Sequence, residues 1–167
     1  RDNVAFSFLA EEMGVDSSLP MANHNFNCGL AKKLAIKISK LADKSKRIGV
    51  LGLSYKPLSH VIEESAGILL CKKLIEFGYE LNVHDPLALE TARPALNGGV
   101  IFYDDPNQCI VHSDLVVLTN PDTVYLSLNW QTVATSKGVL PVYDCWRFFK
   151  DLEKIPAIQY KASGYNN

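Results

Sequence analysis

The run Gly49–Ser65 (GVLGLSYKPLSHVIEES) constrains the fold of this chain more than any other segment. A short apolar strand, Ile48–Leu53, leads through a turn into a helix that the pattern predicts from Ser65 to Phe77. The helix is expected to end at Gly78, because glycine readily adopts the backbone conformation that closes helices. Continuous apolar runs are typical of strands covered by helices on both faces. The segment therefore predicts a buried strand of a parallel sheet.

The same alternation of strand and helix continues toward the C-terminus. Strands are expected at Glu80–His84, Val100–Tyr103, Asp114–Thr119 and Leu140–Tyr143, with helical stretches at 87–97, 105–112 and 122–135 and an extended segment in the tail, 156–167. This order predicts an α/β fold, a Rossmann-like three-layer sandwich with a mostly parallel sheet. Ligands bind such sheets at the carboxyl ends of the strands. We call this edge of the sheet the rim. The residues expected there are Ser54–Lys56, His84–Asp85, Thr119–Asn120 and Asp144–Arg147.

The first part of the chain has helical periodicity. One helix is expected over residues 3–13 and a second over 23–44, with a loop at Asp16–Pro20 between them. In the second helix Leu30, Leu34, Ile38 and Leu41 recur at helical spacing and share one face. We therefore expect two parts, a helical arm over 1–45 and an α/β domain over 46–167.

Composition excludes several function classes. The 17 Lys and Arg residues balance 18 Asp and Glu residues, which gives no support for nucleic-acid binding or for a basic membrane-binding surface. No apolar stretch approaches the length of a membrane span, and the first residues do not resemble a signal peptide. The four cysteines are far apart in the sequence, so neither a metal site nor disulfides are expected, and the chain is expected to be cytoplasmic.

The chain opens on Arg1-Asp2-Asn3 without an initiator methionine, which suggests a piece of a longer protein.

The strand-to-helix turn fails the tests for the common phosphate-binding loops. A dinucleotide fingerprint, GxGxxG, would need glycine at Ser54 and Pro57 when counted from Gly52. No Walker GKS or GKT sequence follows either. The turn instead offers Lys56, a compact cation suited to a phosphate or a sugar oxygen, although spacing alone favours an exposed turn lysine without a ligand. His84-Asp85-Pro86 could supply an acidic residue to a ribose, or Asp85 could simply start a turn or cap a helix.

These segments together resemble the C-terminal part of the UDP-glucose/GDP-mannose dehydrogenase family. The family's G-L-A-F-K motif corresponds to the sequence that ends in Lys56, its D-x-R-E-S segment to 61–65, and its V-Y-D-P to Val83–Pro86. Arg1-Asp2 resembles the end of the family's C-x-P-K-D motif, which would place the catalytic cysteine just before Arg1. The resemblance covers essentially the whole chain.

The resemblance implies a chemistry for the whole enzyme. It would oxidise the C6 alcohol of a nucleotide sugar to a carboxylate, with two hydrides passing to two NAD molecules and a cysteine carrying a thiohemiacetal and then a thioester. Asp2 would be the catalytic aspartate that activates or places water. Lys56, with Tyr55 and Ser54 beside it, would bind the substrate, a UDP- or GDP-sugar. NAD would be bound mainly by an N-terminal domain outside this chain, and residues 23–44 would link the two halves and contribute to a homodimer.

The sequence departs from the family pattern at two places. Val61 and Glu63 stand where the family has an acidic residue and an arginine, so that either Glu63 points away from the ligand or the ligand is held differently. Asp144-Cys145-Trp146-Arg147 stands where the family often has D-G-R-N. Arg147 could take over the role of that arginine as a substrate-binding residue, or it could be a surface arginine packed beside Trp146.

Two other functions compete with the dehydrogenase interpretation. The chain could be an autonomous NAD(P)-binding oxidoreductase, which the failed glycine pattern disfavours. It could also be a non-catalytic module for dimerisation or regulation, in which the changes at Val61 and Glu63 mark a lost nucleotide site.

Overall fold

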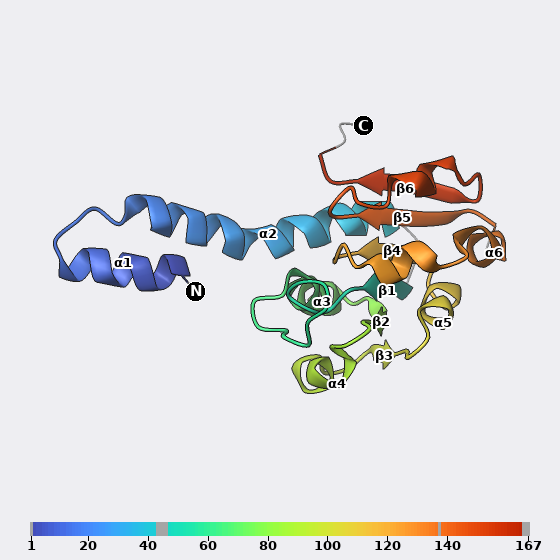
Figure 1. Cartoon of the computed structure of the whole chain (residues 1–167), viewed down its shortest axis with the longest axis horizontal. Helices are drawn as coiled ribbons and strands as arrows, with labels where there is room; N and C mark the ends of the chain where they lie inside the picture. Colours follow the sequence, from blue (N-terminus) through green and yellow to red (C-terminus); the bar gives the residue numbers. More distant parts are fainter. Residues whose placement is uncertain (1, 43–46, 137, 165–167) are drawn as a thin grey trace.

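The chain folds into an α/β domain with a long helical arm (Figure 1). The computed structural model describes residues 2–42, 47–136 and 138–164. In the arm, α1 (Asp2–Glu12) and the first half of α2 (Ser18–Ala42) form an antiparallel hairpin that projects from the domain (Figure 1). The other end of α2 packs on the sheet, where Ala35, Ile38 and Ala42 are buried. The arm is therefore anchored at one end and exposed at the other.

The domain is built on one fully parallel sheet. In the described residues it has six strands, β1 (Arg47–Leu51), β2 (Glu80–His84), β3 (Val100–Phe102), β4 (Leu115–Leu118), β5 (Leu140–Asp144) and β6 (Ile158–Ala162). They are ordered β3-β2-β1-β4-β5-β6, and each neighbouring pair is parallel. This is the strand order of a doubly wound dinucleotide-binding fold, with its topological switch point between β1 and β4. The expected fold class is confirmed.

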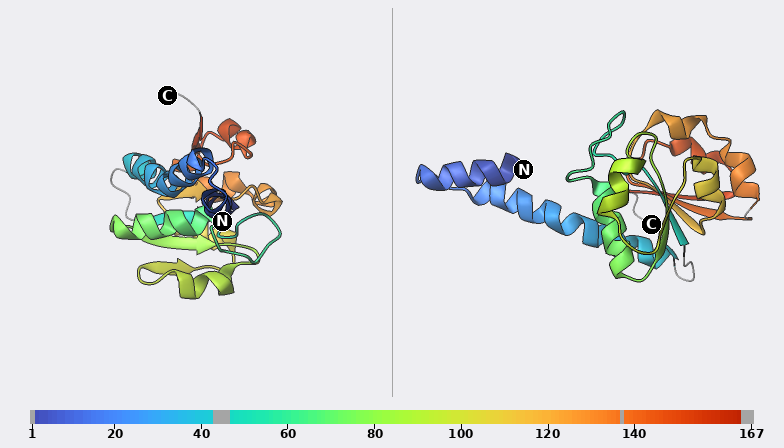
Figure 2. Two further views of the ribbon diagram at one scale, coloured as in Figure 1. Left: turned by 90° about the vertical axis from the view of Figure 1, so that its left-hand side faces the viewer. Right: turned by 90° about the horizontal axis from the view of Figure 1, so that it is seen from below.

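Helices cover both faces of the sheet (Figure 2). One face carries α2, α3 (Ala66–Glu76), α4 (Leu89–Ala92) and the 3₁₀ turn η1 (Arg93–Ala95). The other carries α5 (Pro106–Val111), η2 (Thr123–Ser127), α6 (Trp130–Thr135) and η3 (Lys150–Lys154). Each face has its own apolar core, so the sheet is buried on both sides, as parallel sheets require.

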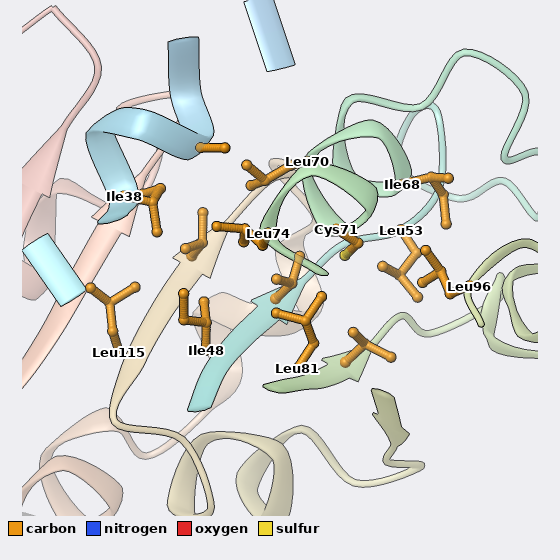
Figure 3. Packing of buried hydrophobic residues seen from close by; sticks show 14 of the residues in the cluster. Ile38, Ile48, Leu53, Ile68, Leu70, Cys71, Leu74, Leu81, Leu96 and Leu115 are labelled. Atoms are coloured by element: carbon orange, nitrogen blue, oxygen red, sulfur yellow. The ribbon is translucent and has the colours of Figure 1, made fainter. Parts of the chain in front are cut away.

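The arm and the sheet share one of these cores. Figure 3 shows Ile38 of α2 beside Leu70 and Leu74 of α3, above the strands. In the sheet beneath, Ile48 pairs in register with Leu81 of β2 and with Leu115 of β4. All of these side chains are fully or almost fully buried. Because their burial removes a large apolar area from water, this contact holds the C-terminal part of α2 on the domain.

The second arm helix starts earlier than its sequence predicts. It begins at Ser18, within the stretch expected to be a loop. The Asp16 carboxylate accepts hydrogen bonds from the Ser18 backbone N–H at 2.9 Å and from the Ser18 hydroxyl at 2.8 Å, and so holds the start of the helix. Pro20 is tolerated because it lies in the first turn, where backbone N–H groups have no partner within the helix.

Two other elements differ from expectation. The helix expected over 122–135 is two elements, η2 and α6, because Leu128 is extended and the Asn129 side chain caps a new helix. The first strand ends at Leu51, before the predicted Leu53, because Gly52 turns the chain at φ +107°. The predicted boundary at 45/46, the predicted helix end at Lys44 and the last three residues of the tail lie outside the described residues. Within the described ranges, no helix combines the length and the apolar character needed to cross a membrane.

Gly67 is needed where α3 meets the end of β1. A Cβ at Gly67 would collide with the Gly52 carbonyl oxygen, whereas a Cβ at Gly29 in α2 would meet nothing within 4 Å. We expect Gly67→Ala to lower the free energy of unfolding by about 2 kcal/mol, because overpacking outweighs the gain in helix propensity. Gly29→Ala, the matched control, should raise it by up to about 1 kcal/mol. Urea unfolding measures both, and equal effects of the two changes would contradict this account of α3 packing.

Candidate functional site

The Asp85 carboxylate organises the carboxyl edge of the sheet beside β2. Its Oδ2 accepts hydrogen bonds from the backbone N–H groups of Leu53 and Ser54, at 2.7 and 2.9 Å, and from the Ser54 hydroxyl at 2.9 Å. Its Oδ1 accepts from the N–H groups of Leu87 and Ala88, at 2.9 and 2.8 Å. Asp85 is 2% exposed, so these donors replace the water that a carboxylate would otherwise keep. With both oxygens engaged, the structure supports the turn-and-cap interpretation of Asp85 over a ribose-binding one.

Lys56 lies in a long loop, residues 52–65, and not in a tight turn. The loop leaves β1 at Gly52 and reaches α3 at Ser65, and it closes on itself through a 2.7 Å hydrogen bond from the Tyr55 N–H to the Val61 carbonyl. Tyr55, Lys56 and Leu58 are exposed, and Leu58 has a left-handed backbone with φ 58°. The loop therefore presents a cation beside apolar side chains at the carboxyl edge of the sheet.

Polar side chains fasten both ends of this loop. The Ser65 hydroxyl donates to the Ser54 carbonyl at 3.3 Å and accepts from the Ile68 N–H, which makes it the N-cap of α3. Asn120, which follows β4, donates through Nδ2 to the Ser54 hydroxyl at 2.7 Å. Thr119 donates from its hydroxyl to the carbonyls of Leu51 and Gly52. The exits of β1 and β4, on the two sides of the switch point, are thus tied together.

A second buried carboxylate, Asp144, shapes the exit of β5. Its Oδ1 accepts from the Trp146 N–H at 2.8 Å, and its Oδ2 accepts from the Phe149 N–H and the Tyr160 hydroxyl, each at 2.8 Å. The turn that it holds includes Arg147 in a left-handed conformation, φ 56°. Asp144 is fully buried, so this turn is fixed by paired donors in the same way as the exit of β1.

A groove of about 450 Å³ opens at this edge, across the switch point. Leu58 of the 52–65 loop contributes one wall, and the connections that follow β2 and β4 contribute the rest through Pro86, Leu87, Asp122, Thr123, Val124 and Ser127. The volume lies in the range of small-molecule sites. Asp122 is buried and accepts from the Val124 N–H at 3.0 Å, which holds the start of η2 in the wall.

The structure brings only part of the predicted site together. Ser54, Tyr55 and Lys56 share the loop beside the groove, with Ser54 buried in the rim and the other two exposed. Arg147 lies apart from them, since its Nη1 is 3.7 Å from where a Cβ of Gly164 would be, beyond edge strand β6. Trp146 reaches toward the neighbouring strand β4, where its Nε1–H donates to the carbonyl of Thr119, which follows that strand, at 2.8 Å.

Asp2 lies at the exposed start of α1, far from the sheet residues in the sequence. In Figure 1 and in the right view of Figure 2, the N-terminal end of α1 points back toward the side of the domain that carries the 52–65 loop. The start of α1, where Asp2 lies, therefore faces the loop side of the domain.

Two further titratable residues of the expected rim, His84 and Cys145, are largely shielded from solvent. His84 is 4% exposed, and burial lowers its pKa although the carboxylates of Asp85 and Asp105 act in the opposite direction. Its Nδ1 lies 3.1 Å from the Tyr125 hydroxyl. Burial also raises the pKa of the Cys145 thiol to about 12, which makes it a poor nucleophile at neutral pH. Within the described ranges, no group of three His, Cys, Asp or Glu side chains could hold a metal ion.

Comparison with known sequences decides the family. Residues 49–151 match the UDP binding domain of the UDP-glucose/GDP-mannose dehydrogenase family. The chain belongs to this family. Its sequence is 26% identical to the UDP-glucose 6-dehydrogenase of Rickettsia bellii over 137 residues, which are 80% of this chain and 32% of that enzyme. A UDP-glucose 6-dehydrogenase of Haloferax volcanii is 27% identical over 135 residues, 80% of this chain and 29% of that protein. The chain thus spans about a third of the length of these relatives.

Solved structures agree with the assignment. A UDP-glucose dehydrogenase from the archaeon Pyrobaculum islandicum superposes with a TM-score of 0.79 and 25% identity, over 96% of this chain and 35% of that one. A GDP-mannose dehydrogenase from Pseudomonas aeruginosa shares the fold, with a TM-score of 0.68 and 22% identity over 84% of this chain and 34% of that one. The superposition on the archaeal enzyme extends over nearly the whole chain, so it includes the helical arm as well as the UDP-binding domain.

The Asp85 carboxylate should dominate the stability of the rim. We expect Asp85→Asn to lower the free energy of unfolding by about 3 kcal/mol, because an amide nitrogen would face buried N–H donors. Asp105→Asn is the matched control: Asp105 is exposed and caps α5 by accepting from the Asn107 N–H, a role that asparagine fills equally well. That change should alter stability by no more than about 0.5 kcal/mol. Chemical unfolding compares the two, and similar values would remove Asp85 as the organising group.

Proposed function

We propose that this chain is the substrate-nucleotide-binding, C-terminal part of an NAD-dependent nucleotide-sugar 6-dehydrogenase that oxidises a sugar C6 alcohol to a uronate. The observation that carries the proposal is the match of residues 49–151 to the family's UDP binding domain. The ligand would be a UDP- or GDP-sugar. By itself the chain is expected to be inactive, with the reactive cysteine and most of the NAD site outside it.

The geometry of the rim supports a nucleotide ligand. Lys56 is exposed on a loop whose two ends are fixed by Asp85, Ser65 and Asn120, so the position of the loop is defined before any ligand binds. A lysine ammonium pairs well with a phosphate and retains its charge at neutral pH. The adjacent groove has room for a nucleoside and carries apolar walls with a few polar groups. We place the diphosphate at Lys56 and the nucleoside in this groove, with Tyr55 and Ser54 beside them.

The β1–α3 connection does not fit NAD. A dinucleotide fold brings a helix N-terminus to the pyrophosphate directly after the first strand. Here the 52–65 loop intervenes, and the start of α3 is capped by the buried Ser65 hydroxyl. This supports an NAD site in another part of the enzyme and disfavours an autonomous NAD(P)-binding oxidoreductase.

We also propose that the arm, residues 1–45, carries Asp2 to the reaction centre while residues 46–167 hold the nucleotide. The direction of α1, whose start faces the loop side of the domain, supports this arrangement. In it, the carboxylate of Asp2 would orient or activate water at the carbonyl carbon of the bound sugar. Reduction of NAD in the presence of UDP-glucose by this chain alone would contradict the proposed division of the active site.

Replacement of Lys56 tests the nucleotide site. We expect Lys56→Ala to weaken UDP binding about tenfold, because a charge-assisted contact to phosphate is lost. Lys72→Ala is the matched control, since Lys72 is an exposed lysine on α3, away from the loop. Isothermal calorimetry with UDP and GDP measures the affinities. Equal affinities of the two variants would exclude Lys56, and no binding to the unaltered chain would overturn the nucleotide site itself.

The arm favours a homodimer. Apolar side chains of α1, of the connection after it and of the outer half of α2 are exposed, among them Phe6, Phe8, Met13, Leu19 and Phe26. Ordinary monomer surfaces seldom gather so many large apolar groups. We propose that two copies pair along their arms and bury these side chains. Such a dimer would form without a nucleotide, so it also suits the competing function, a non-catalytic dimerisation module. That function would be favoured if neither UDP nor GDP changed the melting temperature of the chain.

A charge on the arm should break this dimer. We expect Phe8→Asp to shift the chain to monomers, because pairing would then bury a carboxylate without a partner. Leu126→Asp places the same charge on an apolar position of η2 that is 52% exposed, against 62% for Phe8, and lies outside the arm, so it should leave the dimer intact. Sedimentation velocity over a concentration series measures the change. A monomeric unaltered chain, or equal effects of both substitutions, would contradict pairing through the arm.

A further inference from the structure

Trp146 combines high exposure with a fixed position. Its side chain is 58% exposed, although tryptophan normally buries most of its surface. Its indole N–H donates to the Thr119 carbonyl at 2.8 Å, and its backbone N–H donates to the Asp144 carboxylate at 2.8 Å. With the N–H group satisfied, the exposed part of the ring is purely apolar. Its flat face is suited to ring–ring or ring–CH contact with a ligand.

The indole is held at the edge of the sheet where the nucleotide site lies. Thr119, whose carbonyl accepts this bond, directly follows β4, and its hydroxyl donates to the carbonyls of Leu51 and Gly52 at the exit of β1. The 52–65 loop with Lys56 begins at that point, and the groove wall that starts at Asp122 follows Thr119 in the chain. The ring therefore reaches from the exit of β5 toward the switch point between β4 and β1.

The turn that carries Trp146 is rigid. Asp144 accepts hydrogen bonds from both sides of the turn, at Trp146 and at Phe149, and Phe149 is buried in the core. Arg147 keeps a left-handed backbone, which a non-glycine residue holds only where the surroundings impose it. A ring that is ordered before binding loses little conformational entropy when a ligand packs on it.

We propose that Trp146 is a specificity-determining contact of the nucleotide-sugar site, a flat apolar platform for a ring of the ligand, either the base or the pyranose. This inference rests on the proposed nucleotide-binding function. It gives a role to the position next to Arg147, whose guanidinium extends toward Gly164 and away from the loop.

The chain contains a built-in control for a fluorescence test. It has two tryptophans, and the other one, Trp130, is 4% exposed in the core beneath α5 and α6 and donates to the Tyr125 carbonyl at 2.7 Å. Ligands are titrated into the unaltered chain and into Trp146→Phe, with UDP, UDP-glucose and glucose 1-phosphate as probes. Emission and calorimetric heat are recorded together, and Trp130 alone reports in the variant.

We expect ligand binding to change tryptophan emission in the unaltered chain and not in Trp146→Phe. A change with UDP assigns the base to the platform, whereas a change that requires UDP-glucose or glucose 1-phosphate assigns the pyranose. Trp146→Ala should weaken binding of the responding ligand about tenfold, and Trp146→Phe should restore most of it, since phenylalanine retains a ring face. Phe77→Ala, a matched exposed aromatic at the end of α3, should change neither signal.

Failures of the two proposals are distinguishable. If UDP and UDP-glucose bind with unaltered affinity to Trp146→Ala and emission does not change in the unaltered chain, the platform is overturned while the nucleotide site stands. If no probe gives calorimetric heat with the unaltered chain, both proposals are overturned. Circular dichroism confirms that each variant is folded before its affinity is compared.

Discussion

The buried Asp85 carboxylate is the interaction on which the rest of the rim depends. A carboxylate removed from water costs several kcal/mol unless donors surround it. Here those donors come from two separate segments, Leu53–Ser54 after β1 and Leu87–Ala88 after β2. The charge can be satisfied only when both segments take their native paths. One side chain thus couples the start of the Lys56 loop to the wall of the neighbouring groove.

Asp144 repeats this arrangement on the other side of the switch point, and Asn120 joins the two halves. Asp144 fixes the turn that carries Trp146, and Asn120 donates to Ser54, itself a donor to Asp85. The carboxyl edge of the sheet is therefore a network of buried polar groups, in which the loss of one member leaves its partners unpaired. Tyr55, Lys56 and the Trp146 indole are exposed, and they are carried by segments that this network holds in place.

The sequence predicts the regular parts of this fold better than the site. The sequence predicts Glu80–His84 with its observed bounds, because polar and apolar residues alternate along it between Gly78 and Pro86, as is typical of a strand. The sequence predicts a turn where the structure has the 52–65 loop. The path of the loop depends on Asp85 and Asn120, which hold Ser54 through contacts between residues distant in the sequence. The failed glycine fingerprint has the same origin. A glycine for close packing of helix and strand does exist, but the loop moves it to Gly67, outside the expected spacing.

The structure also explains which parts of the family's D-x-R-E-S segment can change. Ser65 keeps its identity because its hydroxyl caps α3 and ties the helix to the Ser54 carbonyl. Val61 and Glu63 are exposed, and their side chains take no part in the fastening of the loop. Replacing an arginine by Glu63 therefore reverses a charge in solvent, where a high dielectric makes the cost small, and leaves the scaffold intact. The fold thus constrains the ends of the loop and leaves its exposed middle, which includes Lys56, free to vary.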